Sequence, residues 1–160
     1  NKEQALSLFK LSKMEQHDFR ARHGALILMF KAPPMIWRPI AHELIKTPMD
    51  PRLHGIAASQ IAREPVAVDA PLLMLMLGHE DDYLVRSAAV GLGKLKHLEA
   101  ISHFDIISQN ASEEIARTLV SSLGLMNADH SIDMLNQWAQ GHPRSYVQAL
   151  AARQLVRMRR

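Results

Sequence analysis

The feature that most constrains the fold of this chain is a short pattern that returns about every thirty residues. Its clearest copy spans residues 84–93, where an apolar residue and an arginine precede a small pair and the copy closes on Leu-Gly. A second copy spans residues 115–124, shifted by 31 residues. Self-similarity at such a period is typical of repeat architectures, in which each repeat buries its apolar face only against its neighbours.

Three further copies extend the pattern over the chain. Residues 53–62 keep the small pair, residues 147–155 are slipped by one position, and residues 21–28 form a degenerate copy. The closing apolar residues, at intervals of 33, 31, 31 and 32, are Leu28, Ile61, Leu92, Leu123 and Leu155. Spacing this regular predicts five structural repeats.

Each copy has helical periodicity, with apolar or small residues at i, i+3, i+4 and i+7, and follows a break rich in Asp, Gly, Pro or Asn. The breaks are residues 47–51, 78–82, 110–112 and 141–143. Between copies lie apolar stretches of helical length, namely residues 35–46, 69–77, 98–108 and 131–140. We call the helices expected over the copies the motif helices and the others the intervening helices.

The predicted fold is therefore all-α: a right-handed α-solenoid of about five helix pairs in a single domain, residues 1–160. By motif-helix register the repeats are 1–33 (degenerate), 34–64, 65–95, 96–126 and 127–160. Small pairs such as Ala88-Ala89 let helices approach closely. We expect Gly93 and Gly124 to be left-handed C-caps and Ser112 to be an N-cap.

Composition limits the chemistry of the chain. There is no cysteine, which excludes a disulfide framework, a thiolate metal site and a cysteine nucleophile. The longest apolar stretch, residues 71–77, is far shorter than the roughly 20 residues of a bilayer span. A net charge of +3 is a weak indication of a polyanionic partner. The compartment stays open, with the cytoplasm as our default, and we expect the chain to be part of a longer protein.

The pattern Asp-x-x-Val-Arg-x-Ala-Ala-x-x-Leu-Gly, which residues 82–93 match at nearly every position, resembles the HEAT-like repeat first described in phycobilin lyase subunits and widespread in bacterial adaptor proteins. Copies centred on Arg117 and Gly55 match in part, and the resemblance covers most of residues 16–160. It implies that motif helices line a convex side and intervening helices a concave side. It decides no function, because members include lyase subunits, DNA-binding repair proteins and scaffolds.

Two arginines recur at one position of the motif and allow two interpretations. Arg86 and Arg117 could contact anions, or they could pair with the acidic residues of nearby turns and tie adjacent repeats together. We expect the second role, because arginine forks suit carboxylates. The acids concerned are Asp81, Asp82, Glu113 and Glu114.

No catalytic, cofactor or metal site is predicted. The nine histidines include no His-Glu-x-x-His and no pair at i, i+4. There is no Gly-x-Ser-x-Gly and no glycine-rich phosphate loop. The basic tail, residues 153–160, could dock on nucleic acid or an anionic membrane surface, but we favour an ordinary helix whose cations suit its C-terminus.

The expected concave face holds the candidate partner-binding residues. Trp37 and Trp138 both fall in intervening stretches and fit an interface anchor and a core residue equally well. The candidates beside them are Arg38, His42, Lys46, His103, Asn136 and Gln137, and with Asp105, Asp133 and Gln140 in the same stretches they form a surface of mixed charge. The mixture predicts a non-catalytic scaffold that binds a protein or peptide. The alternatives are a nucleic-acid-binding module, a chromophore lyase subunit, and self-association through the ends of the solenoid.

Overall fold

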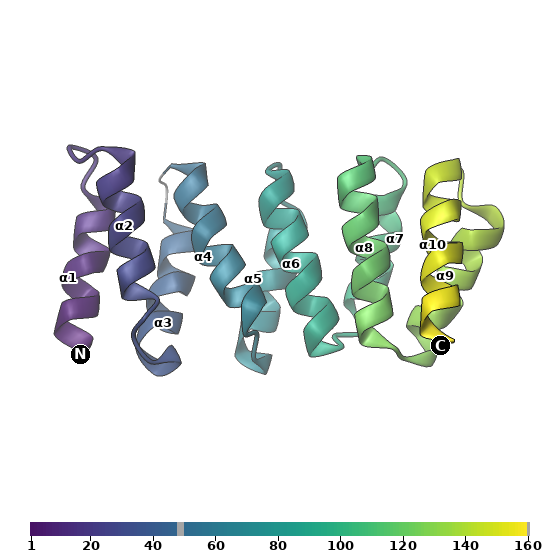
Figure 1. Cartoon of the computed structure of the whole chain (residues 1–160), viewed down its shortest axis with the longest axis horizontal. Helices are drawn as coiled ribbons and strands as arrows, with labels where there is room; N and C mark the ends of the chain where they lie inside the picture. The colour runs from purple at the N-terminus through teal and green to yellow at the C-terminus, as the bar shows by residue number, and fades with distance from the viewer. Residues whose placement is uncertain (48–49, 160) are drawn as a thin grey trace. The chain divides into compact units, whose positions relative to one another are not determined.

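The computed structural model describes residues 1–47 and 50–159 and, within them, contains ten α-helices, one short 3₁₀ helix and no strand. The prediction of an all-α chain is confirmed. The helices form two compact units, residues 1–63 and 64–160 (Figure 1). The division between the units falls one residue before the predicted repeat boundary at 64/65.

The first unit consists of two helix pairs. Its helices are α1 (Lys2–Lys13), α2 (Phe19–Met29), α3 (Pro34–Lys46) and α4 (Pro51–Arg63). Helix α1 packs on α2 and α3 on α4, and the pairs meet through α1 against α3 and α2 against α4. Motif helices thus contact motif helices, and intervening helices contact intervening helices.

The second unit repeats this arrangement. Its elements are η1 (Ala67–Asp69), α5 (Ala70–Met76), α6 (Asp82–Leu95), α7 (Ala100–Ser108), α8 (Glu113–Met126), α9 (Asp129–Gly141) and α10 (Ser145–Met158). The motif helices α6, α8 and α10 pack side by side in one row, with α7 and α9 behind them in Figure 1. Helix α5 packs on α6, α7 on α9, and α9 on α10.

Local signals in the sequence set the helix starts. The carboxylate of Asp18 accepts from the Ala21 backbone N–H at 2.7 Å, and that of Asp81 accepts from Tyr83 at 2.7 Å. Ser112 accepts from Ile115 at 3.4 Å and begins α8, so the predicted N-cap is confirmed. Pro48 and Met49 of the predicted break, and Arg160 of the basic tail, lie outside the described residues.

The predicted closing residues occupy the core in the middle repeats and not in the first. Ile61, Leu92 and Leu123 have no exposed side-chain surface, whereas Leu28 is 53% exposed. In α2 Leu26 and Met29 have no exposed side-chain surface, and Met29, 32 residues before Ile61, takes the position equivalent to the closing residues. The register predicted for the degenerate copy was wrong by one residue, because its weak motif did not distinguish two adjacent apolar positions.

The prediction that Gly93 and Gly124 are left-handed C-caps is wrong. The residues with positive φ at the ends of α6 and α8 are Lys96, at 53°, and Asn127, at 45°. The two glycines lie inside their helices.

The glycines allow motif helices to approach closely. A Cβ on Gly93 would stand 2.9 Å from the Cα of Ser122, closer than two carbon atoms can pack. A Cβ on Gly124 would meet the side chain of Gln154. In both contacts the residue after one closing leucine meets the residue before the next. The row of motif helices in the second unit is therefore built on one repeated contact.

We predict that Gly93→Ala lowers the free energy of unfolding by about 1–3 kcal/mol, because the new methyl group meets backbone that cannot rotate away. Gly24→Ala is the matched control, since Gly24 lies inside α2 with nothing within 4 Å of the added carbon. It should gain about 0.5–1 kcal/mol from helix propensity. Urea denaturation of both variants tests this. Equal effects of the two substitutions would contradict the close-contact role of Gly93.

The hydroxyl of Ser122 gives a second prediction. Among the described residues, its Oγ is the buried side-chain polar atom that has no hydrogen-bond partner. Ser122→Ala removes this unpaired group and keeps the small contact with Gly93, so we expect a gain of about 1 kcal/mol in stability. Thermal unfolding measures it. A loss of stability would mean that the hydroxyl is satisfied in solution.

Candidate functional site

The two tryptophans are core residues, so their role as surface anchors is corrected. Trp37 is 1% exposed and packs edge-on against Phe30, with ring centroids 5.6 Å apart. Trp138 is 2% exposed, and its indole Nε1–H donates to Asp105 Oδ1 at 2.7 Å. Burial of the rings inside the fold leaves neither indole available to a partner.

The other predicted partner-binding residues are divided between the two units. In the first unit, Arg38 lies half-buried with its guanidinium carbon 4.8 Å from the Trp37 ring centroid. His42 is half-buried on α3, and Lys46 is exposed at the end of that helix. In the second unit, His103 is exposed on α7, while α9 carries Asn136, which is half-buried, and Gln137, which is exposed. Each unit therefore holds three of the six residues.

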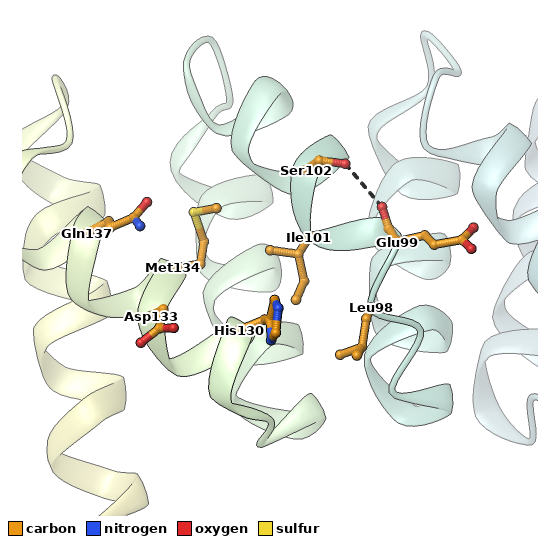
Figure 2. A pocket seen from close by; sticks show the side chains of 8 residues that line it. All are labelled: Leu98, Glu99, Ile101, Ser102, His130, Asp133, Met134 and Gln137. Carbon is orange, nitrogen blue, oxygen red and sulfur yellow. Dashed lines mark hydrogen bonds between the residues drawn. The ribbon is translucent and has the colours of Figure 1, made fainter.

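A groove in the second unit lies between α7 and α9. It has a volume of about 380 Å³ and includes Gln137 of the predicted set. Figure 2 shows Ile101 and Met134 near its centre, with Leu98 and His130 below them. The remaining lining residues are Glu99, Ser102 and Asp133. We call this feature the α7–α9 groove.

The intervening helices of the second unit carry charge of one sign. Helices α5, α7 and α9, with η1, contain no lysine or arginine. Their formal charges come from Asp69, Asp105, Asp129 and Asp133, and Glu99 precedes α7. Arginines instead occur on the motif helices, at Arg86, Arg117, Arg153 and Arg157. The layer that forms the groove therefore attracts cations.

A buried hydrogen-bond network holds α9 against α7 toward the C-terminal ends of both helices. Besides the bond from Trp138 to Asp105, His142 Nε2 lies 2.9 Å from Ser108 Oγ. Ser108 Oγ donates in turn to the Asp105 carbonyl oxygen at 2.6 Å. Because both bonds join helices 33 and 34 residues apart in sequence, they fix the separation of the two groove walls.

The Ser108–His142 pair has the composition of a nucleophile and its base but not the environment. The Arg144 backbone N–H donates to His142 Nδ1 at 3.1 Å, so the neutral ring carries its proton on Nε2 and donates to the serine. A base must accept the nucleophile's proton at that same nitrogen. Ser108 has no exposed surface and His142 is 4% exposed. The pair therefore supports the helix contact and does not act as a nucleophile.

The recurring arginines make different contacts. Arg86 on α6 pairs with Glu114 on α8 at 2.5 Å, which joins adjacent motif helices. Arg117 pairs with Glu113 of its own helix at 2.8 Å. Asp82 is exposed in the first turn of α6, where a carboxylate favours the helix N-terminus. Both ion pairs are at the surface, where such pairs contribute about 0–1 kcal/mol.

The described part of the chain holds no group of three or more histidine or acidic side chains placed to bind a metal ion. None of its helices combines the length and the apolar character that crossing a bilayer requires.

Comparisons with known proteins add no assignment: no protein-family model, no curated protein and no solved structure matches the chain. The HEAT-like resemblance therefore rests on the repeated motif alone.

Most groove residues were absent from the predicted set, although the sequence holds a signal for them. The 31-residue spacing places Glu99 in register with His130 and Ser102 in register with Asp133. Both pairs line the groove. Equivalent positions on successive intervening helices thus meet at one surface, and aligning those helices, as well as the motif helices, identifies it.

We predict that His142 makes the protein less stable as the pH falls from 7 to 5. Burial lowers the pKa of His142 below its ordinary value. The unfolded chain, with a histidine pKa of about 6.5, takes up a proton in this range before the folded chain does. The free energy of unfolding therefore rises with pH through this window. Urea denaturation of His142→Gln should show a shallower pH dependence.

His103→Gln is the matched control, because His103 is exposed on the neighbouring helix α7. Asp50 does not interfere, since Arg52 lowers the pKa of its carboxyl to about 2 and its contribution is lost only at lower pH. An unchanged pH dependence in His142→Gln would contradict the role given to this histidine.

Proposed function

We propose that this chain is a non-catalytic protein-binding module, a right-handed HEAT-like solenoid of about five helix pairs that binds a protein or peptide on its intervening helices. Two features support the solenoid. The motif recurs along the whole chain, and within each unit motif helices pack on motif helices. This packing of like on like is how repeat proteins propagate a continuous core.

The observation that carries the binding function is the charge of the intervening helices of the second unit. A phosphate backbone requires lysine and arginine on the surface that it contacts. Helices α7 and α9 offer acidic groups and histidines instead, and α5 carries no charged residue. A protein or peptide partner fits this layer, and a nucleic acid does not.

Exposed apolar residues on the same layer favour the same conclusion. Leu75 on α5 is 70% exposed and Ile106 on α7 is 71% exposed. They are 31 residues apart and so occupy equivalent positions of successive repeats. Apolar residues recurring at an exposed position are typical of a surface that a partner covers.

Site-specific crosslinking tests the proposal. A photoreactive amino acid at position 106 should crosslink one defined protein in the source cell, because Ile106 lies on the binding layer. The same group at position 125 is the matched control, since Leu125 is 48% exposed on motif helix α8. Equal crosslinking at the two positions would contradict a binding surface on the intervening helices.

The rival function, nucleic-acid binding, has one supporting observation. Helix α10 carries Arg153 and Arg157, both exposed, and contains no acidic residue. Mobility-shift assays with duplex DNA across salt concentrations separate the two functions. Under our proposal the protein causes no shift even at low salt. A strong shift that falls steeply with salt and disappears in Arg153→Gln/Arg157→Gln would establish the rival.

A further inference from the structure

We propose that the α7–α9 groove binds a peptide segment that places one apolar side chain between two cationic residues. The inference rests on the proposed protein-binding function and deepens it, because it names the chemistry of the partner and the residues that select it.

The centre of the groove is suited to an apolar side chain. Ile101 from α7 and Met134 from α9 lie opposite each other near the middle of the groove in Figure 2. Leu98 adds a third apolar side chain, which is 47% exposed. Methionine adapts its flexible side chain to irregular partners, as binding surfaces require. A volume of about 380 Å³ is near the lower limit of ligand sites and suits one or two side chains.

The margins of the groove are suited to cations. Figure 2 shows the carboxylates of Asp133 and Glu99 at opposite margins, both directed away from the apolar centre. None of the lining residues is a lysine or arginine. Complementary charge at the rim of an apolar site determines which partner binds and in which register. A cationic residue on each side of the apolar residue therefore complements this site.

Polar side chains between these regions suit a peptide backbone. The Ser102 hydroxyl donates to the Glu99 carbonyl oxygen at 3.2 Å, which leaves its oxygen able to accept a bond. The Gln137 amide is exposed on the opposite wall and provides both a donor and an acceptor. Together they offer bonds to the N–H and C=O groups of a peptide crossing the groove.

Synthetic peptides test the inference on the full chain. The probes are three fluorescent dodecapeptides with a central leucine, flanked on both sides by arginine, serine or glutamate. The arginine peptide should bind most tightly in fluorescence anisotropy and should shift the ε-methyl resonance of Met134 in methyl-labelled protein. The glutamate peptide should not bind. Equal affinity for all three peptides would overturn the inference.

Charge reversal locates the site. Asp133→Lys should weaken binding of the arginine peptide about tenfold and strengthen binding of the glutamate peptide, since the rim charge is inverted. Glu80→Lys is the matched control, because Glu80 is exposed in the turn before α6 and does not line the groove. It should change affinity by less than about twofold. Helical circular dichroism spectra of both variants verify that they fold.

The outcomes separate this inference from the proposed function. Arginine-peptide binding that Asp133→Lys leaves unchanged, or no peptide binding at all, overturns the groove inference. The protein-binding function then still stands if crosslinking remains specific to position 106. Loss of that crosslinking, together with salt-sensitive DNA binding, overturns both.

Discussion

The close contact between successive motif helices is the constraint on which the second unit depends. Gly93 meets Ser122, and Gly124 meets Gln154, at equivalent points of the row. At Gly93 both residues are small, so α6 and α8 approach closely, whereas at Gly124 the long side chain of Gln154 fills the contact. The buried Leu92 and Leu123 beside these contacts exclude water. On α10, the last motif helix, the residue equivalent to Gly93 and Gly124 is Val156, which follows the closing Leu155. This larger residue is 54% exposed.

The intervening helices are held by different chemistry. Polar bonds from Trp138 to Asp105 and between His142 and Ser108 join α9 to α7. Such bonds are directional, so they fix orientation more strongly than apolar packing does. This explains how a layer with exposed apolar and acidic side chains keeps a defined groove. The surface residues proposed to bind a partner are therefore held in place by buried residues that a partner would not contact.

Much of the fold followed from the sequence because local signals and the repeat agree. Every motif and intervening stretch contains an α-helix, and Ser112 caps α8 as predicted. The errors arose where the cause is tertiary. Gly93 appeared to end a helix because glycine favours left-handed caps, yet Lys96 takes that conformation. Helical periodicity also could not predict that Trp138 is buried, because its hydrogen-bond partner Asp105 lies 33 residues away in the sequence.

The glycine contacts have a geometric consequence for residues 64–160. In the row of motif helices, the distance between neighbouring helices depends on the size of the residue after each closing leucine. In the layer behind it, hydrogen bonds hold α9 at a fixed distance from α7. Enlarging that residue would spread the motif row and leave the tied row unchanged, so the unit would bend. The size of the residue at position 93 thus influences the curvature of the unit, while the hydrogen bonds from α9 to α7 keep the width of the groove on the opposite layer constant.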